Sequence, residues 1–187
     1  SPNKNVIIFG PTGAVGSAAA IEAHRRGANV WLAMRNISKP IPGLDSTPPG
    51  YTRIHADLSK PDTLSDAVKQ SGATTAFVYV MFQSEDHMAS SFAALKAAGI
   101  TYAVLLSSYK VRGAASNKAN ETDFIARVHA QTELALAASG ITYTSVRPAY
   151  FNTNVLWNAD EIKRGEVGLL YPDVKFDFIA PADVGLV

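Results

Sequence analysis

Short runs of apolar residues alternate with segments of helical periodicity over most of this sequence. Turn-forming residues bound the runs, a pattern typical of buried β-strands; the predicted strands are residues 5–10, 29–34, 51–56, 74–82, 101–107 and 141–147. The segments between them have helical spacing, and several end at a glycine; the predicted helices are residues 14–26, 61–70, 86–98 and 121–139.

This alternation predicts the α/β class, because strands joined by helical crossovers form a parallel sheet with right-handed connections. The run at 74–82 is continuously apolar, as expected for a central strand covered on both faces. Residues 39–50 interrupt the pattern with prolines and glycines, so we expect a loop there. We therefore expect a Rossmann-type fold with a doubly wound parallel sheet.

After Pro148 the periodicity loosens, and the predicted elements become short: residues 150–157, 160–164, 169–171 and 176–179, with the start of a helix at 181–187. A helix as brief as the last is marginal by itself. We expect a dinucleotide-binding Rossmann domain over residues 1–150 and the start of a short, incomplete substrate-binding lobe over residues 151–187, in a natural chain that is longer.

Composition narrows the function classes. The 187 residues include no cysteine, which excludes disulfides, thiolate nucleophiles and cysteine-based zinc sites. The net charge is +1, without the basic excess of a nucleic-acid or membrane-surface protein. The first apolar run is too short for a signal peptide or a membrane span. We expect a soluble, cytoplasmic protein with a small-molecule substrate and neither nucleic acid nor membrane as a partner.

A glycine-rich loop follows the first predicted strand and opens the first helix, with the sequence Gly10-Pro-Thr-Gly13-Ala-Val-Gly16. In a dinucleotide site the first glycine permits a tight turn, the second lets the backbone approach a pyrophosphate, and the third lets the helix lie close to the strand. The helix N-terminus then offers free N–H groups to the phosphates. A structural turn that binds nothing is the alternative. The predicted pyrophosphate contacts are Gly10, Thr12, Gly13, Ala14, Val15 and Gly16.

The end of the second strand indicates which dinucleotide is bound. NAD-binding proteins usually place an acidic residue there, whereas an arginine accommodates the 2′-phosphate of NADP. This chain has Arg35 and no acid, and the planar guanidinium suits a phosphate. We therefore expect NADP(H) as the cofactor. The alternative is that Arg35 is simply a solvated side chain.

Two further pairs of residues at strand ends are candidate cofactor contacts. Asp57 and Leu58 follow the third strand, where a carboxylate can accept from the adenine amino group. A turn-forming aspartate before a helix is the equal alternative. Met81 and Phe82 end the fourth predicted strand, at the edge of the sheet where ligands bind. They can line the nicotinamide ribose or belong to the core.

The proton relay of most short-chain dehydrogenases is missing. It is a Tyr-x-x-x-Lys pair on the helix after the fifth strand, in which the tyrosine donates a proton to the reduced carbonyl. The predicted helix 121–139 has no tyrosine. A match at Tyr171 and Lys175 lies far downstream and is interrupted by Pro172, so we treat it as chance. His24, His55 and His87 show no metal-ligand spacing with carboxylates, and we expect no metal.

The sequence resembles the NmrA-like family of atypical short-chain dehydrogenases/reductases, and within it the branch of quinone oxidoreductases and triphenylmethane reductases. The resemblance covers nearly the whole chain. The segment from His129 to Phe151 is more specific than the glycine loop, and the matching segments are residues 10–16, 35–36, 106–108, 129–133, 139–144 and 147–151.

This resemblance implies roles for residues late in the chain. Isoflavone-reductase relatives have a catalytic lysine at the position of His129, whereas the quinone-reductase branch is similar to this chain in having histidine there. His129 would then orient the nicotinamide ribose or supply a proton near neutral pH. The alternative is a surface pair with Glu133, one helical turn later.

Four residues near strand ends complete the candidate site. The resemblance implies that Ser107 bonds substrate or ribose, although its hydroxyl can equally be satisfied by nearby backbone. It also implies that Pro148 and Phe151 pack the nicotinamide and that Tyr150 borders the substrate, although aromatic residues there also serve plain packing. We take His129, Ser107 and Tyr150 as candidate catalytic residues, with Ser107, His129, Pro148 and Phe151 also touching the cofactor.

Together these features predict an NADPH-dependent reductase of a small conjugated acceptor, such as a quinone or an enone. A quinone needs little help from a protein acid, because its reduced form is a stabilised phenolate. One alternative is an NmrA-type regulator that binds NADP, senses its redox state and contacts a protein partner without turnover. Another is a non-redox, isomerase-like biosynthetic enzyme. The fold does not decide among them.

Overall fold

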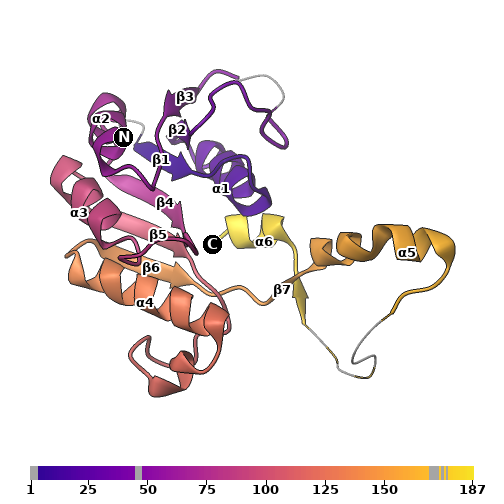
Figure 1. The fold of residues 1–187 in the computed structure, drawn as a ribbon. Coiled ribbons are helices and arrows are strands. Elements are labelled where there is room, and N and C mark those ends of the chain that lie inside the picture. Colours follow the sequence, from indigo (N-terminus) through magenta and orange to yellow (C-terminus); the bar gives the residue numbers. More distant parts are fainter. Residues whose placement is uncertain (1–3, 45–47, 169–172, 174, 176) are drawn as a thin grey trace.

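Six parallel strands form one sheet in the computed structural model, which describes residues 4–44, 48–168, 173, 175 and 177–187 (Figure 1). The strand order is β3-β2-β1-β4-β5-β6. Their bounds are β1 Asn5–Phe9, β2 Asn29–Met34, β3 Tyr51–His55, β4 Thr75–Tyr79, β5 Tyr102–Leu106 and β6 Thr142–Val146. This order and the flanking helices confirm the predicted Rossmann-type, doubly wound sheet.

Helices cover both faces of the sheet (Figure 1). Helices α2 (Pro61–Ser71), α3 (Ala89–Ala98) and α4 (Phe124–Ala138) pack side by side on one face, and α1 (Ala14–Arg25) and α6 (Pro181–Gly185) pack together on the other. Right-handed crossovers dictate this arrangement, because leftward and rightward steps along the sheet place their helices on opposite faces.

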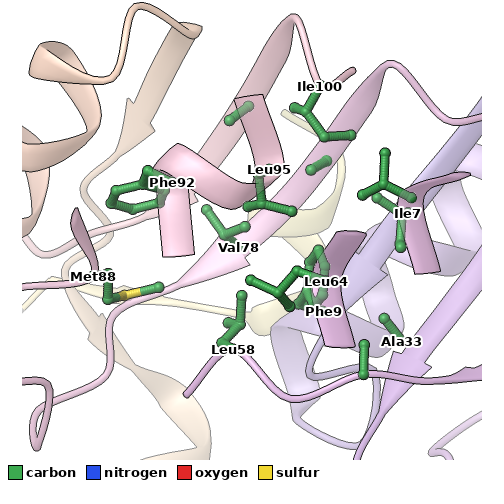
Figure 2. Close-up of a cluster of buried hydrophobic side chains, with 14 of the residues drawn as sticks. Ile7, Phe9, Ala33, Leu58, Leu64, Val78, Met88, Phe92, Leu95 and Ile100 are labelled. Atoms are coloured by element: carbon green, nitrogen blue, oxygen red, sulfur yellow. The ribbon is translucent and has the colours of Figure 1, made fainter. Parts of the chain in front are cut away.

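The central strands are buried on both faces, which explains their apolar runs. In β1, Ile7 and Phe9 enter the core beneath α2 and α3, while Ile8 enters the core beneath α1. Figure 2 shows Ile7 and Phe9 with Leu64 and Leu95 in the first of these cores. Alternate residues of a strand point to opposite faces, so a strand covered twice needs no polar positions.

Strand β4 ends earlier than predicted, at Tyr79 rather than at residue 82. The backbone N–H of Met81 donates to the sulfur of Met88 at 3.4 Å, and the N–H of Ser84 donates to the Met81 carbonyl at 3.2 Å. These bonds turn the chain away from the sheet. Met81 and Phe82 therefore lie in the loop after β4, not at the end of the strand itself.

Helix α3 starts at Ala89 rather than at residue 86, because Asp86 is used in the turn that precedes it. The Asp86 carboxylate accepts from the backbone N–H groups of Met88 and Ser90 and from the Ser84 hydroxyl. The hydrogen bonds from Ser90 and its neighbours lower the pKa of Asp86 to about 2. Short polar side chains compete with the helical backbone in this way.

Helix α4 also starts later than predicted, at Phe124 rather than at residue 121. Residues Lys118–Glu121 form a separate 3-10 turn, η1. The Asp123 carboxylate then accepts from the N–H of Ala126 at 2.9 Å and caps the helix. An aspartate in this position satisfies an N–H group that has no partner within the helix.

The segment after Pro148 is not the continuous element predicted for residues 150–157. Strand β7 (Tyr150–Phe151) is followed by the 3-10 helix η2 (Asn152–Asn158) and by α5 (Ala159–Arg164), which project from the sheet in Figure 1. Strand β7 pairs in parallel with β8 (Phe178–Ile179). The element predicted at 169–171 and residue 176 lie outside the described residues.

The chain returns to the sheet through α6, which packs on α1. The Arg26 guanidinium donates to the Leu186 carbonyl at 2.7 Å, and the side chain of Val184 enters the core beneath α1. Gly185 lies against Ala18, so close that a Cβ would meet its atoms. In the part of the chain that the structure describes, no helix combines the length and apolarity needed to cross a bilayer.

Candidate functional site

The glycine loop lies at the point where the strand order reverses. Strand β1 has β2 on one side and β4 on the other, so the connections after β1 and β4 leave in opposite directions. Ligands of open α/β sheets bind in the crevice that this reversal opens at the carboxyl ends of the strands. Gly10 and Tyr79 meet there, at the ends of β1 and β4.

The three glycines are glycines for different reasons. Gly10 has φ of +69° and lies under the Tyr79 ring, whose Cε1 would be 2.6 Å from an added Cβ. At Gly16 an added Cβ would overlap the Gly10 carbonyl. Gly13 is exposed, has an extended backbone at φ −85°, and an added Cβ would meet only ordinary van der Waals contact. Packing within the protein therefore explains why residues 10 and 16 are glycines. At Gly13 no packing contact requires glycine, and the missing side chain leaves open space above the loop.

The loop also offers unused hydrogen-bond donors. Gly13 is the N-cap of α1 and supplies no side chain to cap the helix. Among the described residues, no acceptor is bonded to the backbone N–H groups of Ala14, Val15 and Gly16. The Val15 side chain is buried in the core, so only its N–H faces the loop. Free N–H groups at a helix N-terminus, beneath a surface without side chains, fit a diphosphate.

Tyr79 is a site residue that the sequence reasoning missed. Besides its contact with Gly10, it borders every one of three neighbouring cavities: a small one of about 60 Å³ beside Gly10 and Thr12, a polar one of about 800 Å³, and an aromatic one of about 400 Å³. Burial raises the pKa of the Tyr79 phenol. Its position was detectable from the sequence, because it is the polar-tipped residue near the end of the central apolar run.

The polar cavity begins at Arg35 and Asp57, which also border the small cavity beside Gly10. Burial acts to raise the pKa of Asp57, but hydrogen bonds from Ser59 and the charge of Arg35 outweigh it and lower the pKa. The Asp57 carboxylate accepts from the N–H and hydroxyl of Ser59, so Asp57 is a turn-forming aspartate before α2. Leu58 is buried in the core, and Met81 lines the polar cavity.

Arg35 is exposed at the mouth of this cavity. Its guanidinium has no hydrogen bond or ion pair with the described residues, and its charge acts on Asp57 and Tyr79. A guanidinium held beside two cavities and left unpaired can form a bidentate contact with a phosphate. This placement agrees with the expected contact to a 2′-phosphate.

We expect Arg35→Ala to weaken NADPH binding by roughly tenfold or more, because a hydrogen-bonded charge pair contributes about 1.5–3 kcal/mol. NADH, which lacks the 2′-phosphate, should lose much less affinity. Fluorescence titration with both cofactors measures the ratio. Arg164→Ala, at an exposed arginine on α5, controls for the change of net charge. Equal losses of NADPH and NADH affinity would argue against the phosphate contact.

The aromatic pocket lies on the other side of Tyr79. Segments after β4, β5 and β6 form it together with the first turns of α4, and it includes Ser107, His129 and Pro148. Its aromatic side chains are Tyr79, Phe82, Tyr109, Tyr150, Phe151 and Trp157. Phe82, predicted to line the nicotinamide ribose, is 49% exposed and borders both large cavities. The fold thus assembles the late candidate residues in one pocket.

His129 lies in the wall of the aromatic pocket rather than on the surface. It is 7% exposed, and its Nδ1 lies 2.8 Å from the carbonyl oxygen of Ile125. The Phe82 ring contacts it edge-on, with 5.3 Å between ring centroids. Burial lowers the pKa of His129, outweighing the hydrogen bond to Ile125 and the charge of Glu133, which act to raise it.

The alternative prediction of a surface pair between His129 and Glu133 is wrong, because Glu133 is buried and bonded to other residues. Arg147 donates to both Glu133 carboxylate oxygens, at 2.9 and 2.6 Å. The hydroxyl of Ser107 donates to the same carboxylate at 2.5 Å. The Ser107 hydroxyl is therefore bonded to a carboxylate rather than to nearby backbone: its proton is used in that hydrogen bond, and only its lone pairs remain as acceptors.

The Glu133–Arg147–Ser107 cluster joins three elements beneath the aromatic pocket. Glu133 belongs to α4, while Arg147 and Ser107 follow β6 and β5. Arg147 also donates to the carbonyls of Val111 and Gly113, at 3.4 and 2.7 Å. The cluster thus holds the loop that carries Tyr109 and Lys110 into the pocket. Among the described residues, no three histidine or carboxylate side chains come together as a metal site would require.

A model of proteins described as NAD(P)H-binding matches residues 10–181. The chain belongs to this NAD(P)H-binding family. The unfilled space at Gly13 and the free N–H groups of α1 are compatible with the diphosphate of such a cofactor.

Two relatives in sequence and one solved structure are similar to this chain. The nitrogen metabolite regulation-like protein bik4 of Gibberella fujikuroi is 39% identical over 194 residues, covering 97% of this chain and 59% of bik4. The (4-alkanoyl-5-oxo-2,5-dihydrofuran-3-yl)methyl phosphate reductase of Streptomyces griseus is 28% identical over 183 residues, covering 97% of this chain and 61% of that protein. The Citrobacter sp. triphenylmethane reductase complexed with NADP(H) superposes with a TM-score of 0.72 at 18% identity, covering 98% of this chain and 63% of that one.

These relatives confirm the resemblance to NmrA-like, atypical short-chain dehydrogenases/reductases. The chain spans about three fifths of the length of each of them. The solved structure is similar to this chain in fold, and the family match concerns binding of NAD(P)H.

Proposed function

We propose that this protein is an NADPH-dependent reductase of a small, flat, conjugated acceptor such as a quinone or an enone. The observation that supports it most is the aromatic pocket, which adjoins the glycine loop through Tyr79 and has aromatic side chains on several sides. A planar acceptor stacks well against such rings. The name of the Streptomyces griseus relative also describes a reductase.

The residues of the glycine loop and the pocket can bind and orient the two reactants of a hydride transfer. Bound NADPH would supply a hydride. The glycine loop and Arg35 would fix the cofactor, and Pro148 and Phe151 would pack beside it, so that orientation rather than acid catalysis lowers the barrier. Tyr150 would border the acceptor. Ser107 would not act as a proton donor, because its hydroxyl already donates a hydrogen bond to Glu133.

Because α4 carries no tyrosine to act as the proton donor of the usual relay, the pocket favours acceptors whose reduced form is a stable anion. Hydride transfer to a quinone yields a phenolate, which takes its proton from water. A simple ketone would yield an alkoxide, which needs an acid at the moment of transfer. The pocket should therefore reduce quinones much faster than ketones.

We expect the purified protein to oxidise NADPH when a benzoquinone or naphthoquinone is added, with little activity toward an aliphatic ketone of similar size. The fall of absorbance at 340 nm measures turnover. A trace without protein corrects for direct reaction of NADPH with the quinone. Tight NADPH binding without turnover of any quinone or enone would contradict the reductase.

A second candidate is a regulator that binds NADP(H) and contacts a protein partner. It is favoured by the 39% identity to bik4, whose name describes nitrogen metabolite regulation. The lack of a tyrosine on α4 agrees with it as well. In that case NADPH and NADP⁺ should differ in affinity or in their effect on the protein's conformation, and the quinone assay should remain silent.

A further inference from the structure

The hydrogen bond to Ile125 fixes which nitrogen of His129 carries a proton. A carbonyl oxygen only accepts hydrogen bonds, so the Nδ1 that lies 2.8 Å from it must be the N–H. In the neutral ring the other nitrogen, Nε2, then has a lone pair and no proton. Among the described residues, none is hydrogen-bonded to Nε2, and the ring borders the aromatic pocket.

The charge of Glu133 acts to favour a second proton on the His129 ring, but the burial of the ring outweighs it. Glu133, one turn along α4, is bonded to Arg147 after β6 and to Ser107 after β5. Lys110, in the loop after β5, borders the pocket as a cation and pairs with Asp123 before α4 at 3.3 Å. The other ionisable groups of the pocket are the phenols Tyr79, Tyr109 and Tyr150.

We propose that His129 is a hydrogen-bond acceptor in the aromatic pocket, where its Nε2 takes a hydrogen bond from a hydroxyl or N–H group of the bound ligand, and that it is not the proton donor of the reaction. The part concerning turnover rests on the proposed reductase function. The donor is either a hydroxyl of the nicotinamide ribose or a hydroxyl of the substrate, and the chemistry of the contact is the same for both.

The two roles of His129 predict opposite pH dependences. An acceptor must be neutral, so kcat/KM for quinone reduction should be constant above pH 7 and fall toward tenfold per pH unit below the pKa of His129. A proton donor must be charged, so the rate would instead fall as the pH rises through that pKa. The second profile would overturn the proposal.

Variants separate this role from a structural one. His129→Gln keeps a side-chain acceptor, and we expect it to retain most of the activity while losing the acidic decline. His129→Phe, which has no acceptor, should lower kcat/KM by roughly tenfold or more at pH 7.5. His55→Gln, at an exposed histidine at the end of β3, should keep the wild-type profile. A wild-type profile in His129→Gln would contradict the proposal.

Binding measurements identify the donor and remain informative without turnover. If the ribose is the donor, NADPH should bind several-fold more weakly at pH 5.5 than at pH 7.5 in the wild type but not in His129→Gln. If the substrate is the donor, NADPH affinity should stay constant, and the KM of a hydroxynaphthoquinone should carry the pH dependence. If neither the NADPH affinity nor the KM depends on pH in this way, the proposal is overturned.

Nitrogen-15 NMR of the imidazole tests the tautomer directly. At pH 7.5 we expect Nδ1 to show the shift of a protonated nitrogen and Nε2 that of an unprotonated one. A proton on Nε2 would overturn the inference whatever the enzymatic activity. Conversely, the expected tautomer in a protein that reduces no quinone would remove the proposed reductase function and leave the acceptor role of His129 intact.

Discussion

Replacing Glu133 with Gln is expected to lower the free energy of unfolding by about 2–4 kcal/mol. The reason is that Arg147, whose side chain is 29% exposed, would lose its anionic partner and keep a single amide oxygen as acceptor in place of two carboxylate oxygens. The Ser107 hydroxyl would lose the same anion. Urea unfolding monitored by circular dichroism measures the change.

Two comparisons show whether the charge pair is the cause. Glu121→Gln removes the same charge from an exposed residue of η1 and should change stability by less than about 0.5 kcal/mol. The double variant Glu133→Leu, Arg147→Met removes both charges, and it should lose less than the sum of the single variants, because no buried charge is left unpaired. Additive losses would show that the two side chains act independently.

The same substitution should affect the pocket. Without the Glu133 carboxylate, the Arg147 guanidinium is held less firmly against the Val111 and Gly113 carbonyls to which it donates. The loop carrying Tyr109 and Lys110 is held from beneath by these bonds, so substrate binding in the aromatic pocket should weaken while NADPH binding at the glycine loop persists. This difference follows from the position of the cluster, on the far side of Tyr79 from Gly10.

The fold could be predicted from the sequence because its determinants are local. The last three residues of β1, Ile7, Ile8 and Phe9, are buried between layers on both faces of the sheet, so they have to be apolar, and the run is visible without knowledge of its neighbours. The glycine loop could be placed for the same reason, since the strand, the glycines and the helix follow one another directly.

The errors at the end of β4 and at Glu133 arise where contacts between separated residues decide the structure. The apolar run of β4 continues past Tyr79, but the sulfur of Met88 draws the chain into a turn, and seven residues separate the two partners. The partner of Glu133 lies 14 residues away on another element, whereas helical spacing points only to His129. The spacing of residues on one helix cannot show which neighbouring element supplies an opposite charge.

Gly13→Ala is expected to weaken NADPH binding by roughly 100-fold, equivalent to about 2.7 kcal/mol, without loss of stability. The backbone at Gly13, with φ −85° and ψ 156°, is open to any residue, and an added Cβ would lie 3.5 Å from the Gly10 carbonyl oxygen, an ordinary contact. Alanine at such a position even stabilises by about 0.4–1 kcal/mol, because it restricts the unfolded chain. The methyl group would instead occupy the space through which a diphosphate approaches the free N–H groups of α1.

Gly16→Ala is the matched control, since it makes the same chemical change three residues later. It should lower stability, whereas Gly13→Ala should lower cofactor affinity. Its Cβ would overlap the Gly10 carbonyl, which belongs to the backbone and has little room to move. We therefore expect a clear drop in melting temperature for Gly16→Ala, and for Gly13→Ala an unchanged or slightly higher melting temperature with lost affinity for NADPH and NADH alike. Both cofactors share the diphosphate, so a loss confined to NADPH would place the added methyl group near the 2′-phosphate instead. If Gly13→Ala binds both cofactors as the wild type does, the diphosphate does not lie on this loop.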